Sequence, residues 1–371
     1  MTEISVLMPV YNGKVYLEQS VESILSQTFS SFEFIIIDDC STDSTYDILL
    51  AYAALDSRIK LHKNESNFGI EKTLNIGLAI AQGKYVARQD ADDISFENRL
   101  EKQFSFLEHT PAVGAIGAAV EIIDSQGQKV GESHPPTDHE SLKMLFLINN
   151  FMHHSTLMAR RDLLMHIGGY NEQMRRAEDY DLWWRLSCHS RVENLPEVLL
   201  KRRLDDGPRI SVLHRESQLI CSYKIALGAV VDTIGNRSYF PKKSYERLWW
   251  AILGTLDRNS FLNYWSIPQG KAGELSFNDI KQLYPLWNFI YISPGGRLAW
   301  GTLLQPLILD FINLKKFVCA FQILYITQFN WKIKVRYFLI LKVLVRALLP
   351  SCILSLSIPL RQKTFSTKSD F

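Results

Sequence analysis

Three carboxylates crowd into four positions of the chain. Asp90, Asp92 and Asp93 lie in the stretch ARQDADDISFENRL, directly after a segment with the pattern of a strand. Like charges this close repel each other, so a compensating ligand is expected. Two carboxylates flanking Ala91 on an exposed turn suit a hard divalent cation that keeps positions open for phosphate oxygens. Such a cation also acts as a Lewis acid on a departing diphosphate. The alternative, capping of the next helix, does not require three acids.

The elements that must position this turn alternate along the first 90 residues. Apolar runs predict strands, and apolar residues at helical spacing predict helices between them. This alternation argues for a mainly parallel α/β sheet with crossover helices. The strands are expected at 4–10, 32–39, 58–62 and 84–90, and the helices at 15–27, 43–55 and 70–82.

Sites in such sheets lie at the carboxyl ends of the strands. The polar residues expected at that edge are Asn12, Asp38, Asp39, Asp90, Asp92 and Asp93. Asp43 differs from these, because it is placed to cap the helix that follows.

Composition bounds the class of protein. The chain has 371 residues, 47% hydrophobic and 22% charged, which suits one large globular domain or two smaller ones. Its five cysteines show no metal-ligand spacing, so a reducing cytosolic compartment fits better than a disulfide framework. The N-terminus lacks the pattern of a secretory signal.

The net charge of +2 conceals an asymmetry. Residues 311–371 hold ten Lys or Arg and one acid, which leaves 31 basic and 38 acidic residues elsewhere. This tail includes two uncharged runs, 317–329 and 347–360, both too short to span a membrane. Apolar segments with interleaved Lys and Arg favour contact with an anionic membrane surface. Dimerisation or covering of a core is the alternative, and nothing else supports nucleic-acid binding.

Several ordered motifs resemble the nucleotide-sugar glycosyltransferases of family 2. They lie in 6–45, 83–103 and 177–186, and the resemblance spans roughly residues 3–211. It implies a GT-A fold over 1–211. It also implies Mg²⁺ or Mn²⁺ as the cofactor. Beyond the resemblance, residues 212–371 are expected to form a mostly helical region that contacts a membrane surface or mediates oligomerisation.

The resemblance implies roles on the donor side. Asp39 would bind the base, typically uracil, Asp92 would bind the metal, and Asp90 would support the ribose or the metal, with Ala91 between them. Lys72 would neutralise phosphate, although a solvated helix lysine has the same pattern. The residues expected to line the nucleotide pocket are Pro9, Val10, Tyr11 and Asn12. Arg88 and Arg99 would balance the acidic charge or contact substrate.

On the acceptor side, RRAEDYDLWWRL (175–186) resembles the family's ED motif. Asp179 would be the general base and Glu178 would position a sugar, so attack opposite the leaving group would invert the anomeric centre. The alternative role for these acids is a favourable charge at a helix N-terminus. Trp183 could stack on a sugar or belong to the core. His154 could contact either substrate or be structural.

The sequence departs from the family's pattern at one candidate metal ligand. Many relatives carry Arg-x-His after the base motif, whereas KRRLDDGPRIS (201–211) places Asp205 where the histidine is expected. A carboxylate can also bind a hard cation, so Asp205 is a further candidate ligand.

The sequence therefore predicts a metal-dependent, inverting glycosyltransferase. Its expected donor is a nucleotide sugar, namely a UDP sugar. Its expected acceptor is a saccharide or a lipid-linked sugar of O-antigen or capsule synthesis. The expected location is the cytoplasmic face of the inner membrane, with homo-oligomerisation through the C-terminal region as a further possibility. Two alternatives are a non-catalytic sugar-nucleotide-binding scaffold and a metal-dependent nucleotidyltransferase. The latter normally needs a glycine- and lysine- or arginine-rich phosphate loop, which the N-terminus lacks.

Overall fold

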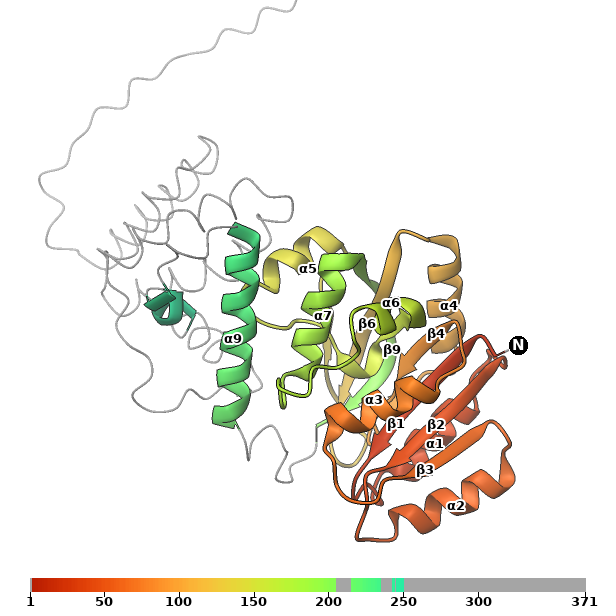
Figure 1. The fold of residues 1–371 in the computed structure, drawn as a ribbon. Coiled ribbons are helices and arrows are strands. Elements are labelled where there is room, and N and C mark those ends of the chain that lie inside the picture. The colour runs from red at the N-terminus through yellow and green to blue at the C-terminus, as the bar shows by residue number, and fades with distance from the viewer. Residues whose placement is uncertain (1, 205–214, 235–241, 244, 250–371) are drawn as a thin grey trace, which may run out of the picture.

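The computed structural model describes residues 2–204, 215–234, 242–243 and 245–249 (Figure 1). The strands in this part of the chain are β1 (Ile4–Val10), β2 (Phe32–Asp38), β3 (Ile59–Lys63), β4 (Tyr85–Arg88), β5 (Ile94–Ser95), β6 (Val113–Ile123), β7 (Lys129–Ser133), β8 (Met158–Arg160) and β9 (Arg191–Arg203). The helices are α1 (Leu17–Leu25), α2 (Thr45–Leu55), α3 (Ile70–Ile80), α4 (Arg99–His109), α5 (His139–Leu145), α6 (Arg161–His166), α7 (Glu178–His189), α9 (Arg215–Ile234) and a 3₁₀ turn, η1 (His154–Thr156).

The strands form one mixed sheet in the order β3-β2-β1-β4-β8-β6-β9-β5, with β7 paired to β6. Its N-terminal half is parallel, because β1 pairs with both β2 and β4 and β2 pairs with β3 in that sense. The short β8 runs antiparallel between β4 and β6, while β6 and β9 pair in parallel. The carboxyl ends of β1, β2 and β4 consequently lie at one edge.

Alternate residues of the central strands enter different layers of core. Val6 of β1 and Ile36 of β2 pack with α1, α2 and α4. Leu7 and Ile37 face the opposite way and pack with α3 and α7. This period-2 alternation within fully apolar strands produces a sheet covered by helices on both faces.

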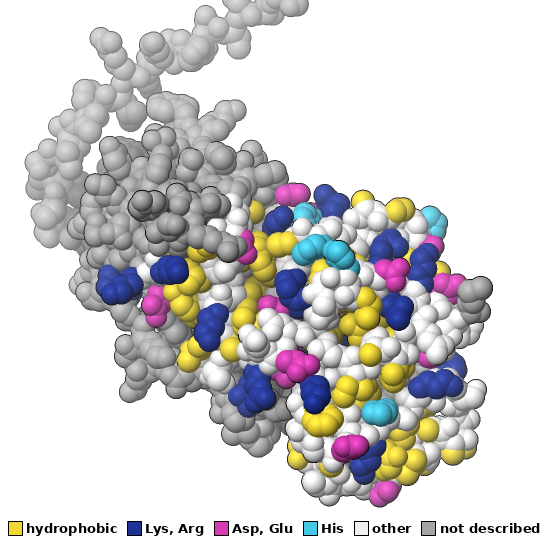
Figure 2. Space-filling model, viewed as in Figure 1, with side chains coloured by type: hydrophobic (Ala, Val, Ile, Leu, Met, Phe, Trp, Pro, Cys, Tyr) yellow, Lys and Arg dark blue, Asp and Glu magenta, His cyan; other side chains and the backbone are white. Residues whose placement is uncertain are grey.

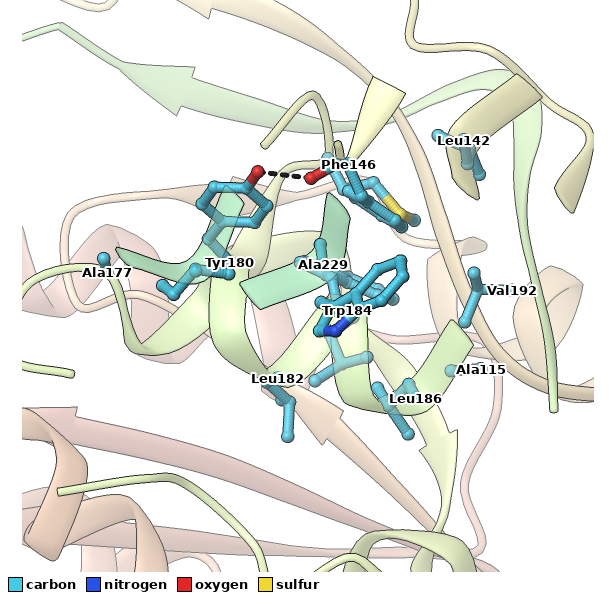
Figure 3. Close-up of a cluster of buried hydrophobic side chains, with 14 of the residues drawn as sticks. Ala115, Leu142, Phe146, Ala177, Tyr180, Leu182, Trp184, Leu186, Val192 and Ala229 are labelled. Carbon is cyan, nitrogen blue, oxygen red and sulfur yellow. Dashed lines mark hydrogen bonds between the residues drawn. The ribbon is translucent and has the colours of Figure 1, made fainter. Parts of the chain in front are cut away.

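The second of these layers continues into the C-terminal part of the chain. Figure 1 shows α9 running alongside α7, and Figure 3 shows Ala229 of α9 among the buried side chains of this layer. Leu248 and Trp249 belong to the same apolar cluster and are fully buried. Residues beyond the family-like region are therefore part of the core that supports the sheet.

The expected α/β fold is confirmed, with small shifts at the ends of elements. The strand predicted at 84–90 is shorter, because β4 ends at Arg88 and Gln89 uses its side chain to bridge the following turn. The domain boundary predicted after residue 211 and both apolar runs of the tail lie outside the described residues.

Charge is mixed on the face of the described chain that Figure 2 shows. On the face shown in Figure 2, basic and acidic side chains are interspersed rather than gathered into a patch of one sign. No helix within the described ranges is both long enough and apolar enough to cross a bilayer.

Candidate active site

The ends of β1 and β2 are joined by hydrogen bonds. The Thr42 backbone N–H donates to Asn12 Oδ1 over 2.8 Å, and the Asn12 N–H donates to Ser41 Oγ over 2.9 Å. Asn12 adopts a φ of 51°, in the left-handed region that asparagine tolerates better than most residues. Asn12 and Tyr11 are exposed at this edge, whereas the Val10 side chain is buried in the core, where only its backbone can face a ligand.

Asp39 anchors the loop that leads into α3. Its Oδ1 accepts hydrogen bonds from Asn64 Nδ2 and the Phe68 N–H, both over 2.8 Å. Its Oδ2 accepts from the N–H of Gly69 over 2.9 Å, and Gly69 has a φ of 88° that favours glycine. One oxygen therefore retains capacity for a ligand, and the carboxylate is fixed in orientation. Lys72, one turn into α3, is exposed, with Nζ 3.8 Å from the Phe68 ring centroid.

The acidic turn after β4 is held by a buried polar network. Gln89 Nε2 donates to the carbonyls of Asp90 and Asp93 over 3.1 and 2.9 Å. Arg99 is fully buried and donates to Gln89 Oε1 over 2.9 Å and to the Arg88 carbonyl over 2.6 Å. The Arg99 guanidinium makes these hydrogen bonds inside the protein, which supports a role in balancing the acidic charge rather than in contacting substrate.

The three acids of this turn have different partners. Asp90 Oδ1 lies 2.5 Å from Nη2 of Arg88, which is 1% exposed, and the arginine contributes to holding the pKa of Asp90 below its usual value against the effect of burial. Asp93 is buried and accepts from the Arg203 N–H over 2.9 Å. Asp92 is exposed at the surface, yet the surrounding protein and the charge of Asp90 raise its pKa to about 6. No salt bridge reaches Asp92 within the described part of the chain.

These residues fit a divalent cation that is shared with a ligand. Asp92 carries a charge that Asp90 opposes, so a cation beside it would relieve repulsion. Across the residues the structure describes, no group of three or more His, Cys, Asp or Glu is placed to hold a metal ion. The protein would therefore supply one or two carboxylates and leave the other positions to phosphate oxygens and water, which is how Mg²⁺ is usually bound. Asp205, the further candidate, lies outside the described residues.

The second acidic pair begins α7. Asp179 accepts the Tyr180 N–H at Oδ1 over 2.7 Å and Asn150 Nδ2 at Oδ2 over 2.8 Å. Glu178 is 7% exposed, and its Oε2 is buried without a hydrogen-bond partner in the described chain. Burial and the neighbouring Asp179 raise the pKa of Glu178 to about 8, and burial raises that of Asp179. Both shifts favour the protonated form, so the environment of this pair disfavours two negative charges.

Tyr170 is close to both acidic groups, and His154 is paired with it. His154 Nε2 lies 2.9 Å from the Tyr170 hydroxyl, and burial with the charge of Arg88 lowers the His154 pKa to about 3. Burial together with the charges of Glu178, Asp179 and Asp90 raises the pKa of Tyr170. The charge of Asp90 also acts to raise the pKa of Asp179, which indicates that the two motifs face a common region.

The sequence left two roles open for Trp183, stacking on a sugar and packing in the core. Trp183 is 0% exposed and packs within the apolar layer shared by α5, α7 and α9, so it presents no ring face on which a sugar could stack. It lies four residues after Asp179 on the same helix, yet its ring is enclosed by the core. The core role that the sequence left open is the one observed.

Sequence reasoning also missed residues. Asn150 is in direct contact with Asp179, and Arg202 lowers the pKa of Asp90, Asp92 and Asp179 by its charge. Asn150 stands in a stretch without periodicity, so nothing local marks it. Arg202 lies in the basic run KRR at the end of β9, which was a usable signal.

Known proteins with sequences similar to this chain are described as glycosyltransferases. A family model described as Glycosyl transferase family 2 matches residues 5–168. An uncharacterized glycosyltransferase of Haemophilus influenzae is 35% identical over 222 residues, covering 57% of this chain and 69% of that protein. The O-antigen biosynthesis glycosyltransferase WbnJ of Escherichia coli is 33% identical over 213 residues, covering 54% of this chain and 79% of that protein.

Solved structures confirm the fold. A crystal structure of residues 1–349 of S. aureus TarS, in complex with UDP-GlcNAc, superposes with a TM-score of 0.55 at 19% identity, over 88% of this chain and 90% of that one. At this identity the likeness concerns the fold, which is GT-A. Together with the matched family model and the coverage of the curated relatives, it leads to one conclusion: the chain belongs to glycosyl transferase family 2.

Proposed function

We propose that this glycosyltransferase is a metal-dependent, inverting enzyme that moves a sugar from a nucleotide donor, a UDP sugar, to a hydroxyl of a saccharide or lipid-linked acceptor. The observation that carries the proposal is the contrast between two nearby acidic groups. Asp90 is kept ionised beside Arg88, whereas Asp179 and Glu178 have raised pKa values. The first environment suits cation binding and the second suits proton transfer.

The donor would bind along the carboxyl ends of β1, β2 and β4. Asn12 and the remaining acceptor capacity of Asp39 would bind the nucleoside, with Pro9, Val10 and Tyr11 beside them. Asp92, with Asp90, would hold Mg²⁺ or Mn²⁺ through their carboxylate oxygens. When bound, that cation supplies neutralisation of the departing diphosphate. Lys72 would add positive charge on the same side.

The chemical step would use Asp179. The acceptor O–H gives its proton to the Asp179 carboxylate as its oxygen bonds to the anomeric carbon, and the bond from that carbon to the diphosphate oxygen breaks. Attack from the face opposite the leaving group inverts the anomeric centre. The raised pKa of Glu178 favours its protonated form, which would donate a hydrogen bond through Oε2 to a sugar oxygen. His154 is neutral and paired with Tyr170, which suits a contact to either sugar.

Release of nucleoside diphosphate from a panel of UDP and GDP sugars, with Mn²⁺ present, tests this proposal. Asp92→Ala and Asp179→Ala should each reduce turnover by about 100-fold or more. Asp162→Asn, at an exposed carboxylate in the first turn of α6, is the matched control and should be neutral. Equal turnover in all four proteins would favour a binding scaffold, and transfer of a nucleotidyl group would favour the alternative enzyme class.

We further propose that the acceptor belongs to cell-surface polysaccharide assembly and that the enzyme acts at the cytoplasmic face of the inner membrane. The name of the Escherichia coli relative assigns that protein to O-antigen biosynthesis, which supports the first part of this proposal. The basic tail would supply peripheral membrane contact or a homo-oligomer contact. Truncation after residue 310, followed by membrane fractionation and measurement of mass in solution, separates these two. A truncated protein that pellets unchanged would exclude the tail as an anchor.

A further inference from the structure

Three consecutive carbonyls after α5 are buried and accept hydrogen bonds from side chains. The Tyr180 hydroxyl donates to the Phe146 carbonyl, as the dashed line in Figure 3 shows. The Leu147 carbonyl accepts from the Tyr245 hydroxyl, and the Ile148 carbonyl accepts from Trp249 Nε1 over 2.7 Å. Carbonyls at the end of a helix lack intrahelical partners, and leaving one buried and unpaired costs about 1–3 kcal/mol.

Two of these three donors come from far along the chain. Tyr245 is separated from Leu147 by 98 positions, and Trp249 from Ile148 by 101. Both rings are fully buried and pack on Tyr223 of α9, with ring centroids 6.2 and 5.5 Å away. They lie well beyond residue 168, where the family match ends. This segment of the C-terminal part is thus built into the layer beneath the site.

The same loop carries Asn150, whose amide has a defined orientation. Its Oδ1 accepts the Met152 N–H over 2.9 Å, so its Nδ2 is turned toward Asp179 Oδ2 at 2.8 Å. The Asn150 N–H is itself held by Asn149 Oδ1 over 2.9 Å. The Tyr180 N–H donates to the other carboxylate oxygen, Oδ1. Each carboxylate oxygen of Asp179 therefore accepts a hydrogen bond from one protein donor.

We propose that Asn150 is a positioning residue for the Asp179 carboxylate, and that Tyr245 and Trp249 hold the loop that presents it. The proposal rests on the role of Asp179 as the base. A donor to the ionised carboxylate favours its charged form and opposes the effect of burial. It also fixes the direction in which the remaining lone pairs point, and small misplacements of a base are costly to rate. The C-terminal part would in this way contribute to proton transfer without touching substrate.

The first test replaces Asn150 and follows nucleoside diphosphate release from the active donor as a function of pH. Asn150→Ala should lower kcat about tenfold and move the acidic limb of the kcat profile to higher pH, with donor KM within about twofold. Asn150→Asp keeps the shape of the side chain but adds a second negative charge beside Asp179. The acidic limb of its kcat profile should therefore move to still higher pH than that of Asn150→Ala. A drop in melting temperature with an unmoved limb would assign Asn150 a structural role only and overturn the proposal.

The second test removes the distant donors. Tyr245→Phe and Trp249→Phe keep aromatic rings but lose the hydrogen bonds to the loop, and each should move the limb in the same direction as Asn150→Ala. Combining Tyr245→Phe with Asn150→Ala should give less than the sum of the single effects, because both act through one contact. Tyr52→Phe is the matched control, because it loses an exposed hydrogen bond in which the Tyr52 hydroxyl donates to Glu22 Oε1 over 2.9 Å.

The outcomes separate this proposal from the proposed function. Wild-type turnover in Asp179→Asn would refute the base assignment itself. An inactive Asp179→Asn, together with Asn150→Ala and Tyr245→Phe proteins that keep the wild-type kcat and pH limb, would leave the base in place and refute only the positioning role. Strict additivity in the double variant would refute the connection between residues 245–249 and the base.

Discussion

The two acidic motifs use the same residue types but balance their charge differently. In the turn after β4, Asp90 pairs with the buried guanidinium of Arg88. At the start of α7, Asp179 accepts from neutral donors, and Glu178 Oε2 has no hydrogen-bond partner in the described chain. A fixed cation keeps one carboxylate ionised, whereas burial beside a second acid favours the protonated form of the other. These two environments are the basis for proposing metal chemistry at one motif and proton chemistry at the other.

Removing the guanidinium of Arg88 from the turn after β4 should have the largest effect on stability. Arg88→Met leaves Asp90 unpaired in a crowded acidic turn and deletes a donor to the Gln89 carbonyl. We expect a loss of about 3–5 kcal/mol in the free energy of unfolding at pH 7, measured by urea denaturation. Arg175→Met, at an exposed site in the loop before α7, should change it by less than about 0.5 kcal/mol. Equal stability of the two variants would remove the distinction between the motifs.

The second motif should reveal its protonated acid through pH dependence. Glu178 has a folded-state pKa of about 8 and an ordinary value of 4.5, so the folded protein keeps a proton that the unfolded chain releases between these values. Stability should therefore fall as pH rises through this window, by about 3 kcal/mol between pH 4.5 and pH 7. Glu178→Gln should lose this pH dependence, so its stability relative to wild type should increase toward pH 8. Glu97→Gln, at an exposed site, should have the same pH dependence as wild type. Parallel melting-temperature curves for all three proteins would contradict the assignment.

Trp183 tests whether the helix that carries the base also binds sugar through its aromatic face. Because the ring is fully buried, Trp183→Phe should leave a small cavity and reduce stability by about 1–3 kcal/mol. Donor KM should stay within about twofold, since no ring face is offered to a ligand. A large rise in KM with unchanged melting temperature would restore the stacking role.

Replacing Lys72 should have the smallest effect of these changes, and it tests the donor side of the comparison. Its contact with the Phe68 ring is exposed, so Lys72→Met should change stability by less than about 1 kcal/mol. If it neutralises phosphate, donor KM should rise several-fold at low ionic strength, and the difference should shrink in 0.5 M salt because screening weakens exposed charges. A KM that matches wild type at every salt concentration would assign Lys72 to the solvated helix surface.

The sheet and the donor-side acids could be predicted from sequence because their signals are local. Apolar runs of β1 and β2, helical spacing in α1 and α3 and acids at strand ends all appear within short windows, and parallel pairing brings those ends to one edge. The predicted strand 58–62 is β3 at Ile59–Lys63, a shift of one residue. Such differences arise because ends depend on turns rather than on periodicity.

What lies around each acid depended on contacts between distant segments. Asn150 and Asp179 are 29 positions apart, and the donors to the loop before Asn150 are separated from it by about 100. Whether Trp183 faces solvent or core was decided in the same way, by α5 and α9 packing over α7. Propensity and patterning describe a residue and its near neighbours, whereas burial and hydrogen-bond partners exist only after the chain has folded. The acids themselves could thus be read from the chain, but their protonation and orientation are properties of the packed protein.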